Sequence, residues 1–534
     1  MKKIVFSLGL ALMLSTAAYS QVDEKVDLKS WQHLSLEDTG VYGVNTQKAL
    51  DFLKAKKRKP SNITVAVLDS GIEVTHEDLQ DNIYTNQKEK AGNGKDDDKN
   101  GYVDDIHGWN FIGGANGNVD GDTLEFVRIY RELIPLFTGE NAESNQKKFP
   151  EKYNLYKELK QKYETELAEA KLYTAQFEEI LNRIKEPLQT LAAKHGDIIL
   201  TQENLQKNRK TFEPYQDALL VFGMVSEEVW NNRKLKDFSN DILKDLEEGV
   251  KYYSDKINYH LNLKDDFRAV VGDNYANKTE HLYGNADVDG PDSNHGTHVA
   301  GIIAAKRNNH IGIDGIAGDG YAKIMSVRTV PNGDERDKDV ANAIRYAVDN
   351  GAKILNMSFG KAYSPEKELV WDAFKYAESK GVLLVKAAGN ENLNVDEENN
   401  FPTIFNDKGE VIAHNVITVG ASTVDPLVLK SSFSNYGKKS VDVFAPGSDI
   451  YSAVPTREGK YQSNSGTSMA SPVVAGVAAL VWAHYPKLSV KEVKEIILQS
   501  VNKNDQLTDY SVTGGVVDAY KAVQLAEKKY AGRK

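Results

Sequence analysis

The sequence contains no cysteine among its 534 residues. This absence excludes disulfides, thiol nucleophiles and cysteine-ligated metal sites, so stability must come from core packing or bound ions. No long basic block offsets the formal net charge of −11, which argues against nucleic acid or an anionic membrane as a partner. The remaining composition, 40% hydrophobic and 27% charged, is that of an ordinary globular protein with a sizeable core.

The N-terminus has the layout of a secretory signal peptide. Lysines follow Met1, the stretch Ile4–Ala18 is mostly apolar, and small residues precede Gln21. We therefore expect cleavage before Gln21 and a secreted or periplasmic protein. An uncleaved membrane tether is the alternative, although the apolar stretch is short for a membrane span. No later segment is apolar for long enough, so we expect no membrane span after cleavage.

Two parts of the chain predict an α/β fold. The apolar run at residues 63–68 precedes Asp69-Ser70-Gly71 and fits a strand buried on both faces of a parallel sheet. From residue 295 onward helices and strands alternate, which predicts a three-layer sandwich around a mostly parallel central sheet. The expected helices are 295–306, 337–350, 365–380, 471–484 and 489–500, and the expected strands are 322–330, 352–357, 382–386 and 416–419.

Between these parts lies a segment with a different pattern. Apolar residues recur every three or four positions from Tyr156 to Ile184, which is one face of a long helix that Pro187 is expected to end or kink. Residues 202–233 and 235–260 continue the helical pattern. We predict an inserted all-helical subdomain, with a structural role as the simplest interpretation. The predicted organisation is a signal peptide at 1–20, an α/β domain formed by 21–121 and 271–525, the helical insertion 122–270, and a tail at 526–534.

Three local signals carry chemistry: Asp69 in VAVLDSGI, His295 in NHGTHVAG and Ser468 in SGTSMASP. A serine hydroxyl needs a base to take its proton, histidine titrates near neutrality, and a buried carboxylate can orient the imidazole. Singly, these residues are more often a turn aspartate, a packed histidine and a helix cap. Their joint occurrence points to nucleophilic catalysis.

In this chain order the three motifs resemble those of the subtilisin-like serine proteases, the subtilases. The resemblance covers residues 40–120 and 280–525 and extends to NMSFG at 356–360, AAGN at 387–390, VGAS at 419–422, FSNYG at 433–437 and DVFAPG at 442–447. It implies a serine endopeptidase that acts on proteins or peptides through an acyl-enzyme.

The resemblance also assigns roles to residues. It makes Asp69 the orienting acid, His295 the general base and Ser468 the nucleophile, with Asn390 in the oxyanion hole and His298 as a structural residue. It further implies that two segments line the pocket for the residue before the cut, Ser358-Phe359-Gly360 and Ala387-Ala388-Gly389. The first of these segments would pair with an extended peptide by strand addition.

Other classes fit less well. Residues 466–470 approach the G-x-S-x-G motif of α/β-hydrolase esterases, but in that fold the serine precedes the acid and the histidine. No HExxH motif supports a metalloprotease. A catalytically silent secreted scaffold that binds partners through the helical insertion is the alternative, and the intact triad and Asn390 argue against it.

An acidic segment begins like a calcium loop. Its pattern, D-x-D-x-N-G, offers Asp96, Asp98 and Asn100 as ligands, continued by the Tyr102 carbonyl and by Asp104 or Asp105. The twelfth position holds histidine instead of glutamate, so this is not a full EF-hand. Structural Ca²⁺ is common in subtilases, and the alternative is an acidic, turn-rich loop.

The chain departs from simple subtilases in its spacing. Asp69 and His295 lie 226 residues apart, where those proteases have a few tens, and about 48 residues separate Gln21 from Asp69. The second interval is short for the folded propeptide of many subtilases. Our hypothesis is that the insertion replaces one propeptide role, as a lid, an inhibitor or a substrate-selecting arm.

Overall fold

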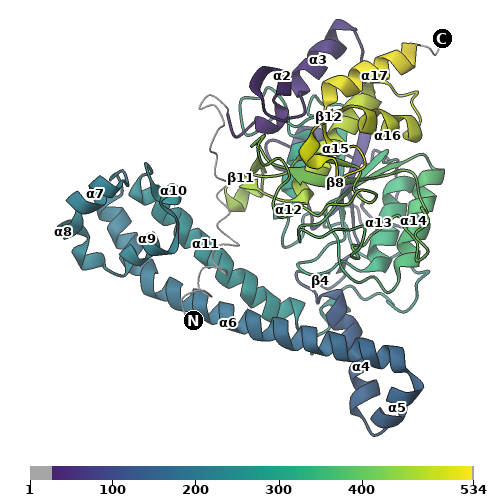
Figure 1. The fold of residues 1–534 in the computed structure, drawn as a ribbon. Helices are drawn as coiled ribbons and strands as arrows, with labels where there is room; N and C mark the ends of the chain where they lie inside the picture. The colour runs from purple at the N-terminus through teal and green to yellow at the C-terminus, as the bar shows by residue number, and fades with distance from the viewer. Residues whose placement is uncertain (1–26, 532–534) are drawn as a thin grey trace. The chain divides into compact units, whose positions relative to one another are not determined.

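A computed structural model describes residues 27–531 of the chain. The predicted signal peptide lies outside the described residues. The described chain forms two compact units. The α/β unit comprises 27–125 and 266–531, and the helical unit comprises Phe126–Asp265 (Figure 1).

The α/β unit is built around a nine-stranded sheet in the order β12-β13-β9-β8-β7-β6-β1-β5-β2. Neighbouring strands pair in parallel except β12 and β13. The strands are β1 (Ile63–Asp69), β2 (Gly108–Asn110), β5 (Ala322–Arg328), β6 (Ile354–Met357), β7 (Leu383–Ala387), β8 (Val416–Ser422), β9 (Val443–Pro446), β12 (Val501–Lys503) and β13 (Gly515–Val517).

Successive residues of the central strands feed two apolar layers, one on each face of the sheet. Val65 and Val67 of β1 join the layer that contains α12 (Asn294–Ala304) and α15 (Thr467–His484). Ala66 and Leu68 join the opposite layer, with α13 (Asp337–Asp349) and α14 (Lys367–Ser379). A strand buried on both faces has to be apolar throughout, which explains the run at 63–68. The unit is the predicted three-layer α/β sandwich (Figure 1).

The remaining elements of the α/β unit cover the sheet and connect its strands. They include the short helices η1 (Trp31–His33) and α2 (Leu36–Thr39), then α3 (Thr46–Ala55), α16 (Val490–Gln499) and α17 (Ala519–Ala531), with the hairpins β3 (Gly113–Gly114)–β4 (Gly117–Asn118) and β10 (Ile450–Ala453)–β11 (Tyr461–Asn464). A capping box begins α16, because Ser489 and Glu492 each bond the other's backbone N–H. The predicted helices and strands of this unit agree with the structure to within about four residues, as is usual for element ends.

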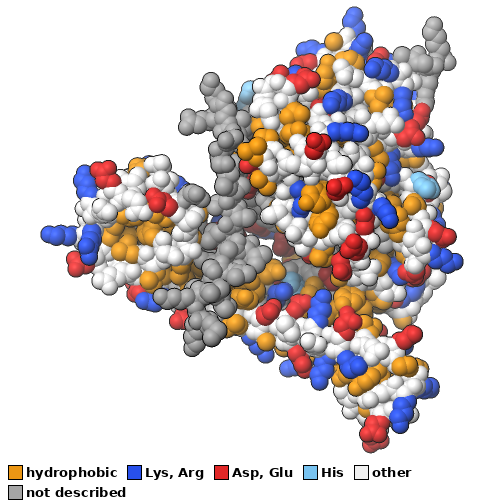
Figure 2. Space-filling view, viewed as in Figure 1, with side chains coloured by type: hydrophobic (Ala, Val, Ile, Leu, Met, Phe, Trp, Pro, Cys, Tyr) orange, Lys and Arg blue, Asp and Glu red, His pale blue; other side chains and the backbone are white. Residues whose placement is uncertain are grey.

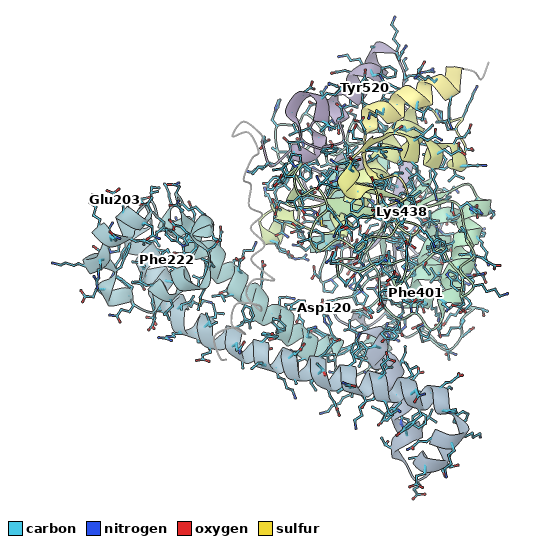
Figure 3. All side chains as sticks on the ribbon, viewed as in Figure 1. Asp120, Glu203, Phe222, Phe401, Lys438 and Tyr520 are labelled. Atoms are coloured by element: carbon cyan, nitrogen blue, oxygen red, sulfur yellow. The ribbon has the colours of Figure 1, made fainter. Side chains whose placement is uncertain are left out.

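The helical unit is dominated by two long helices that pack along each other, α6 (Pro150–His195) and α11 (Leu235–Asp255) (Figure 3). The other α-helices are α4 (Glu125–Thr138), α5 (Ala142–Lys148), α7 (Gln202–Lys207), α8 (Arg209–Phe212), α9 (Val221–Met224) and α10 (Glu227–Trp230), and the short helices η3 (Glu213–Tyr215), η4 (Ala218–Leu220) and η5 (Lys256–His260) lie between or after them. Phe177, Leu188, Phe238 and Leu246 belong to an apolar core confined to this unit.

Helix α6 continues through Pro187, so of the two predicted effects of this proline, an end or a kink, the end is wrong. Proline removes one backbone hydrogen bond, and the packing of Ile184, Leu188 and Leu191 in the core outweighs that loss. Tertiary contacts therefore stabilise the helix around Pro187, where its sequence has the lowest helix propensity.

Two features bear on whether the protein contacts a membrane, namely the charge pattern of its surface and the hydropathy of its helices. Lys/Arg and Asp/Glu side chains alternate over the visible face of the α/β unit, which suits a soluble surface (Figure 2). Within residues 27–531, one helix is long and apolar enough to cross a membrane, Thr467–His484, and 94% of it is buried inside the protein. Its apolar character is explained by its place in the core between α12 and the sheet.

Candidate active site

Asp69 lies at the carboxyl end of β1, between β5 and β6. Later strands of the chain pair with β1 on both of its sides, and such a switch point is where open α/β sheets place their functional groups. The side chain is 2% exposed, and its Oδ1 accepts a hydrogen bond from the Ser70 N–H at 2.8 Å. This buried carboxylate is therefore held in one orientation.

His295 is the second residue of α12, and its Nδ1 lies 2.7 Å from Asp69 Oδ1. Burial disfavours the charged imidazolium, but the Asp69 carboxylate and its hydrogen bond outweigh burial, so the pKa of His295 is raised. The close approach depends on Gly296, where a Cβ would lie 2.1 Å from the Gly71 carbonyl oxygen. The pair has the geometry of a general base and its orienting acid.

Ser468 is the second residue of α15 and is preceded by Gly466-Thr467. Its Oγ donates to the Ser358 carbonyl at 3.1 Å, and among the described contacts no hydrogen bond joins it to His295. A χ1 rotation redirects a serine hydroxyl, and catalytic hydrogen bonds are often unformed in enzymes without substrate. The helix start also leaves first-turn N–H groups without intrahelical partners, which suits stabilisation of an anion.

Asn390 is oriented by Thr467. The Asn390 Oδ1 accepts hydrogen bonds from the Thr467 N–H at 2.8 Å and from its hydroxyl at 2.9 Å. With the oxygen fixed in this way, the amide Nδ2 is the group left to donate, and it faces the Gly466–Ser468 turn. Gly389 N–H donates in turn to the Thr467 hydroxyl at 3.0 Å. Thr467 therefore orients the Asn390 side chain, a role that the sequence motifs did not indicate.

The segment Ser358-Phe359-Gly360 follows β6 and is fixed to the start of α15. Ser358 Oγ donates to the Ser468 carbonyl at 2.9 Å and accepts from Asn356 Nδ2 at 2.9 Å. Asn356 Oδ1 accepts from Ser471 Oγ at 2.9 Å. This buried network connects the strand, the predicted substrate segment and the serine-bearing helix, and its signal in sequence was only the NMSFG run.

The segment Ala387-Ala388-Gly389 ends β7. Gly389 has φ +101°, and a Cβ there would lie 2.3 Å from Asn435 Nδ2, so both conformation and space require glycine. Asn435 and Asn400 both donate to the Ala388 carbonyl. The Asn400 side chain also lies against Gly360, since a Cβ on Gly360 would be 2.8 Å from Asn400 Oδ1. The structure therefore brings the two predicted pocket segments to the same place, with Asn400 beside both.

Two further buried side chains support the site without reaching its reacting atoms. His298 has its Nε2 3.2 Å from the Gln462 carbonyl, and burial together with the nearby His295 lowers its pKa to about 3. Arg328 ends β5 beside Asp69 and donates to the Ser70 carbonyl at 2.7 Å. Burial lowers the pKa of Arg328 to about 10. Sequence reasoning missed Arg328 because a single arginine in a strand carries no motif.

The acidic loop, residues 86–105, gathers carboxylates around one point. Oxygen atoms of Glu89, Asp96 and Asp98 lie within 4.8 Å of one another. Glu89 is 8% exposed, and its buried Oε2 has no hydrogen-bond partner, while its Oε1 accepts from the Asp98 N–H. Three converging carboxylates with one unsatisfied buried oxygen fit a hard divalent cation such as Ca²⁺. Glu89 lay outside the loop motif and was not predicted.

The other residues predicted as ligands have different partners. Asp104 accepts from the backbone N–H groups of Asn93 and Gly94, and the chain turns at Asp104 with φ +57°. Asp105 is buried and accepts from Asn86, Asn100 and the Tyr346 hydroxyl. Asn100 Oδ1 accepts from the Tyr102 N–H. These contacts shape the loop around the three converging carboxylates.

Comparisons with known proteins identify the family of this chain. The pattern described as "Subtilase family" matches residues 60–148 and 156–515. A thermophilic serine proteinase of Bacillus sp. (strain AK1) is 41% identical over 233 residues, which are 43% of this chain and 52% of that protein. Thermitase of Thermoactinomyces vulgaris is 42% identical over 231 residues, which are 43% of this chain and 75% of thermitase.

The match thus spans about half the length of the Bacillus relative and three quarters of thermitase. A solved structure of proteases from Pseudoalteromonas arctica aligns with 95% of this chain and 99% of its own, at 20% identity and a TM-score of 0.49. The family match covers more than half of the chain and includes the segments that bear Asp69, His295 and Ser468. This chain belongs to the subtilase family.

Proposed function

We propose that this chain is a secreted or periplasmic serine endopeptidase that hydrolyses peptide bonds in proteins. The observation that carries the proposal is the 2.7 Å contact of His295 with the buried Asp69, in a unit where Ser468 contacts the segment after β6 and Asn390 follows β7. Membership of the subtilase family supports it. The signal-peptide pattern at residues 1–20 is the basis for proposing export.

In the acylation step, Ser468 Oγ attacks the carbonyl carbon of the scissile peptide bond. His295 Nε2 accepts the hydroxyl proton and then gives it to the leaving amine as the C–N bond breaks. Asp69 holds Nδ1 protonated and stabilises the imidazolium that forms between these transfers. The raised pKa of His295 has the same cause, since the carboxylate favours the charged ring.

The negative charge that develops on the carbonyl oxygen needs donors already in place. One donor is the Asn390 Nδ2, which is left to donate because Thr467 bonds the Asn390 Oδ1. The other is the Ser468 N–H at the start of α15. Water then attacks the acyl-enzyme by the same route, with His295 as base. The carboxylic acid product leaves and Ser468 recovers its proton.

Substrate binding would use the two pocket segments. The backbone of Ser358–Gly360 directly follows β6 and can pair with an extended peptide, so we call this segment the substrate edge. Ala387–Gly389 and Asn400 would enclose the side chain that precedes the cut. A protein chain of any fold can supply such an extended segment, so proteins and peptides are the proposed substrates.

Ca²⁺ is the proposed structural ion of the acidic loop. Glu89, Asp96 and Asp98 would supply carboxylate oxygens, and binding would satisfy the Glu89 Oε2 that is otherwise buried without a partner. The loop's other carboxylates maintain its shape. The ion has no part in the proposed reaction and would stabilise the loop that leads into β2.

The test is labelling of purified protein with a fluorophosphonate serine probe, beside Ser468→Ala. Stoichiometric labelling of the natural sequence and none of the variant would establish an activated nucleophile. Peptide-bond cleavage of a denatured protein substrate would establish endoproteolysis. No labelling and no cleavage by a folded protein would overturn the proposal in favour of the scaffold alternative.

A further inference from the structure

A buried lysine follows the predicted substrate segment directly. Lys361 comes after Gly360 and is 5% exposed. Its Nζ contacts Glu125 Oε2 at 2.8 Å, Asp337 Oδ1 at 2.9 Å and the Glu335 carbonyl at 2.8 Å. A buried ammonium surrounded by three acceptors is held in one position, since any shift would leave a charge desolvated and unpaired.

The backbone of Lys361 joins the two sides of the pocket. Its N–H donates to the Phe401 carbonyl at 2.9 Å, and its carbonyl accepts from the Phe401 N–H at 2.8 Å. Phe401 follows Asn400, which bonds the Ala388 carbonyl and lies against Gly360. One residue thus fixes the Ser358–Gly360 edge and the Asn400 side of the pocket together.

The acidic partners of Lys361 come from the place where the chain enters the helical unit. Glu125 is the last residue of the α/β unit before Phe126 and the first residue of α4. Its N–H donates to Asp334 Oδ2 at 2.7 Å. Three residues earlier, Asp122 forms a bidentate pair with Arg336. The entry to the insertion is therefore anchored to the 334–337 segment that also holds Lys361.

Packing alone does not explain why Lys361 is buried together with carboxylates. A lysine directly after the substrate segment would be stable with its ammonium in solvent, where long basic side chains usually place it. Here the ammonium points inward to the carboxylate that begins the insertion. The arrangement connects the position of the substrate edge to the residue from which the inserted chain departs.

We propose that Lys361 is a positioning residue for extended substrates, and that its pair with Glu125 makes the substrate-binding edge depend on the root of the insertion. The inference rests on the proposed endopeptidase function. It concerns binding of the substrate residues that pair with the backbone of Ser358–Gly360 and leaves the chemistry at Ser468 unchanged. A displacement of the edge by a fraction of an ångström would weaken every backbone hydrogen bond to the peptide.

The experiment compares two substrates on Lys361→Met, Glu125→Gln and Lys361→Arg, each normalised to the number of sites titrated with the fluorophosphonate probe. One substrate is a peptide anilide with several residues before the cut, and the other is a single-residue ester that cannot pair with the edge. For Lys361→Met we expect kcat/KM for the peptide to fall about 10-fold or more, mainly through KM, because small misplacements are costly. The ester should change less than about twofold, since it makes none of these contacts.

Glu125→Gln is the milder variant, because Lys361 keeps its contacts with Asp337 and the Glu335 carbonyl. It therefore tests the proposal even if Lys361→Met fails to fold. It should lower the peptide-to-ester ratio in the same direction, and Lys361→Arg, which keeps the charge, should restore part of it. The matched control is Lys375→Met, which removes a pair with the exposed Asp372 on α14 and should leave the ratio unchanged. An unchanged ratio in Glu125→Gln, or equal losses on both substrates, would overturn this inference. Absent probe labelling of the natural sequence would instead sink the proposed function.

Discussion

At the scale of single residues, the Asp69–His295 pair sets how activity should depend on pH. His295 must be neutral to accept a proton, and the Asp69 carboxylate raises its pKa against the opposing effect of burial. We expect kcat/KM to rise with pH, with a midpoint above the ordinary histidine value of about 6.5. A pH profile with a peptide substrate measures this midpoint directly.

Asp69→Asn should change this profile in two ways. Removing the charge lowers the pKa of His295, so the acidic limb should move to lower pH. The rate should fall about 10⁴-fold, because the ring loses its orientation and its counter-charge. Asp292→Asn is the control, since Asp292 raises the pKa of His295 through its charge alone. Equal losses in both variants would contradict the orienting role of Asp69.

The Thr467–Asn390 contact gives a second prediction at this scale. Asn390→Leu removes the proposed oxyanion donor and should lower kcat about 10²–10³-fold with little change in KM. Thr467→Val keeps the shape of the side chain but removes the hydroxyl that bonds Asn390 Oδ1 and Gly389 N–H. It should give a smaller loss in kcat, because the Thr467 N–H still holds the amide. Steady-state kinetics on both variants test the order, and a larger loss for Thr467→Val would refute it.

At the scale of elements, the approach of α12 to the turn after β1 is set by Gly296. Gly296→Ala would place a methyl group 2.1 Å from the Gly71 carbonyl and 3.2 Å from Asp69 Cβ, so α12 would have to move away. We expect the loss of the 2.7 Å contact to lower kcat/KM about 100-fold. Gly223→Ala in α9 is the control, since its Cβ would meet nothing within 4 Å. Kinetics that are unaffected in Gly296→Ala would show that the helix can shift without cost to the site.

The acidic loop gives an element-scale prediction about stability. If Ca²⁺ binds at Glu89, Asp96 and Asp98, a concentration of about 100 times the Kd should stabilise the fold by about 2.7 kcal/mol. Glu89→Gln should abolish this increment, seen as a Ca²⁺-dependent Tm in the natural sequence alone. Asp104→Asn is the matched control, because the Asp104 carboxylate accepts from the N–H groups of Asn93 and Gly94 and is not one of the three converging carboxylates. A Tm insensitive to Ca²⁺ and to chelator would reject the ion.

The same loop shows how far sequence reasoning reached. Asp96 and Asp98 could be named because a two-residue step in a turn brings side chains together locally. Glu89 could not, because it converges on them only after the chain has folded back, and the Asp104 carboxylate instead accepts from the backbone of Asn93 and Gly94. The strands of the sandwich were predictable because burial on two faces requires a continuous apolar run. The contacts of Thr467 and Lys361 were not, since each depends on a distant segment.

At the scale of the whole molecule, the separation into two units has a thermodynamic consequence. Each unit has its own apolar core, with Phe238 fully buried in the helical unit and Phe374 fully buried beside the sheet. Multi-unit chains of this size need not unfold in one step. We expect calorimetry to resolve two transitions, because each unit has an apolar core of its own.

Phe238→Ala and Phe374→Ala form the matched pair that assigns these transitions. Each removes a fully buried phenyl ring and should cost about 3–5 kcal/mol in the unit that contains it. Phe238→Ala should lower one transition and leave labelling of Ser468 by the fluorophosphonate probe intact at temperatures below it. Phe374→Ala should lower the other transition, and labelling should disappear with it, because α14 and β7 support the pocket segment Ala387–Gly389. If both variants shifted both transitions equally, the insertion and the α/β unit would be one cooperative structure, and the insertion's stability would then set the temperature limit of the active site.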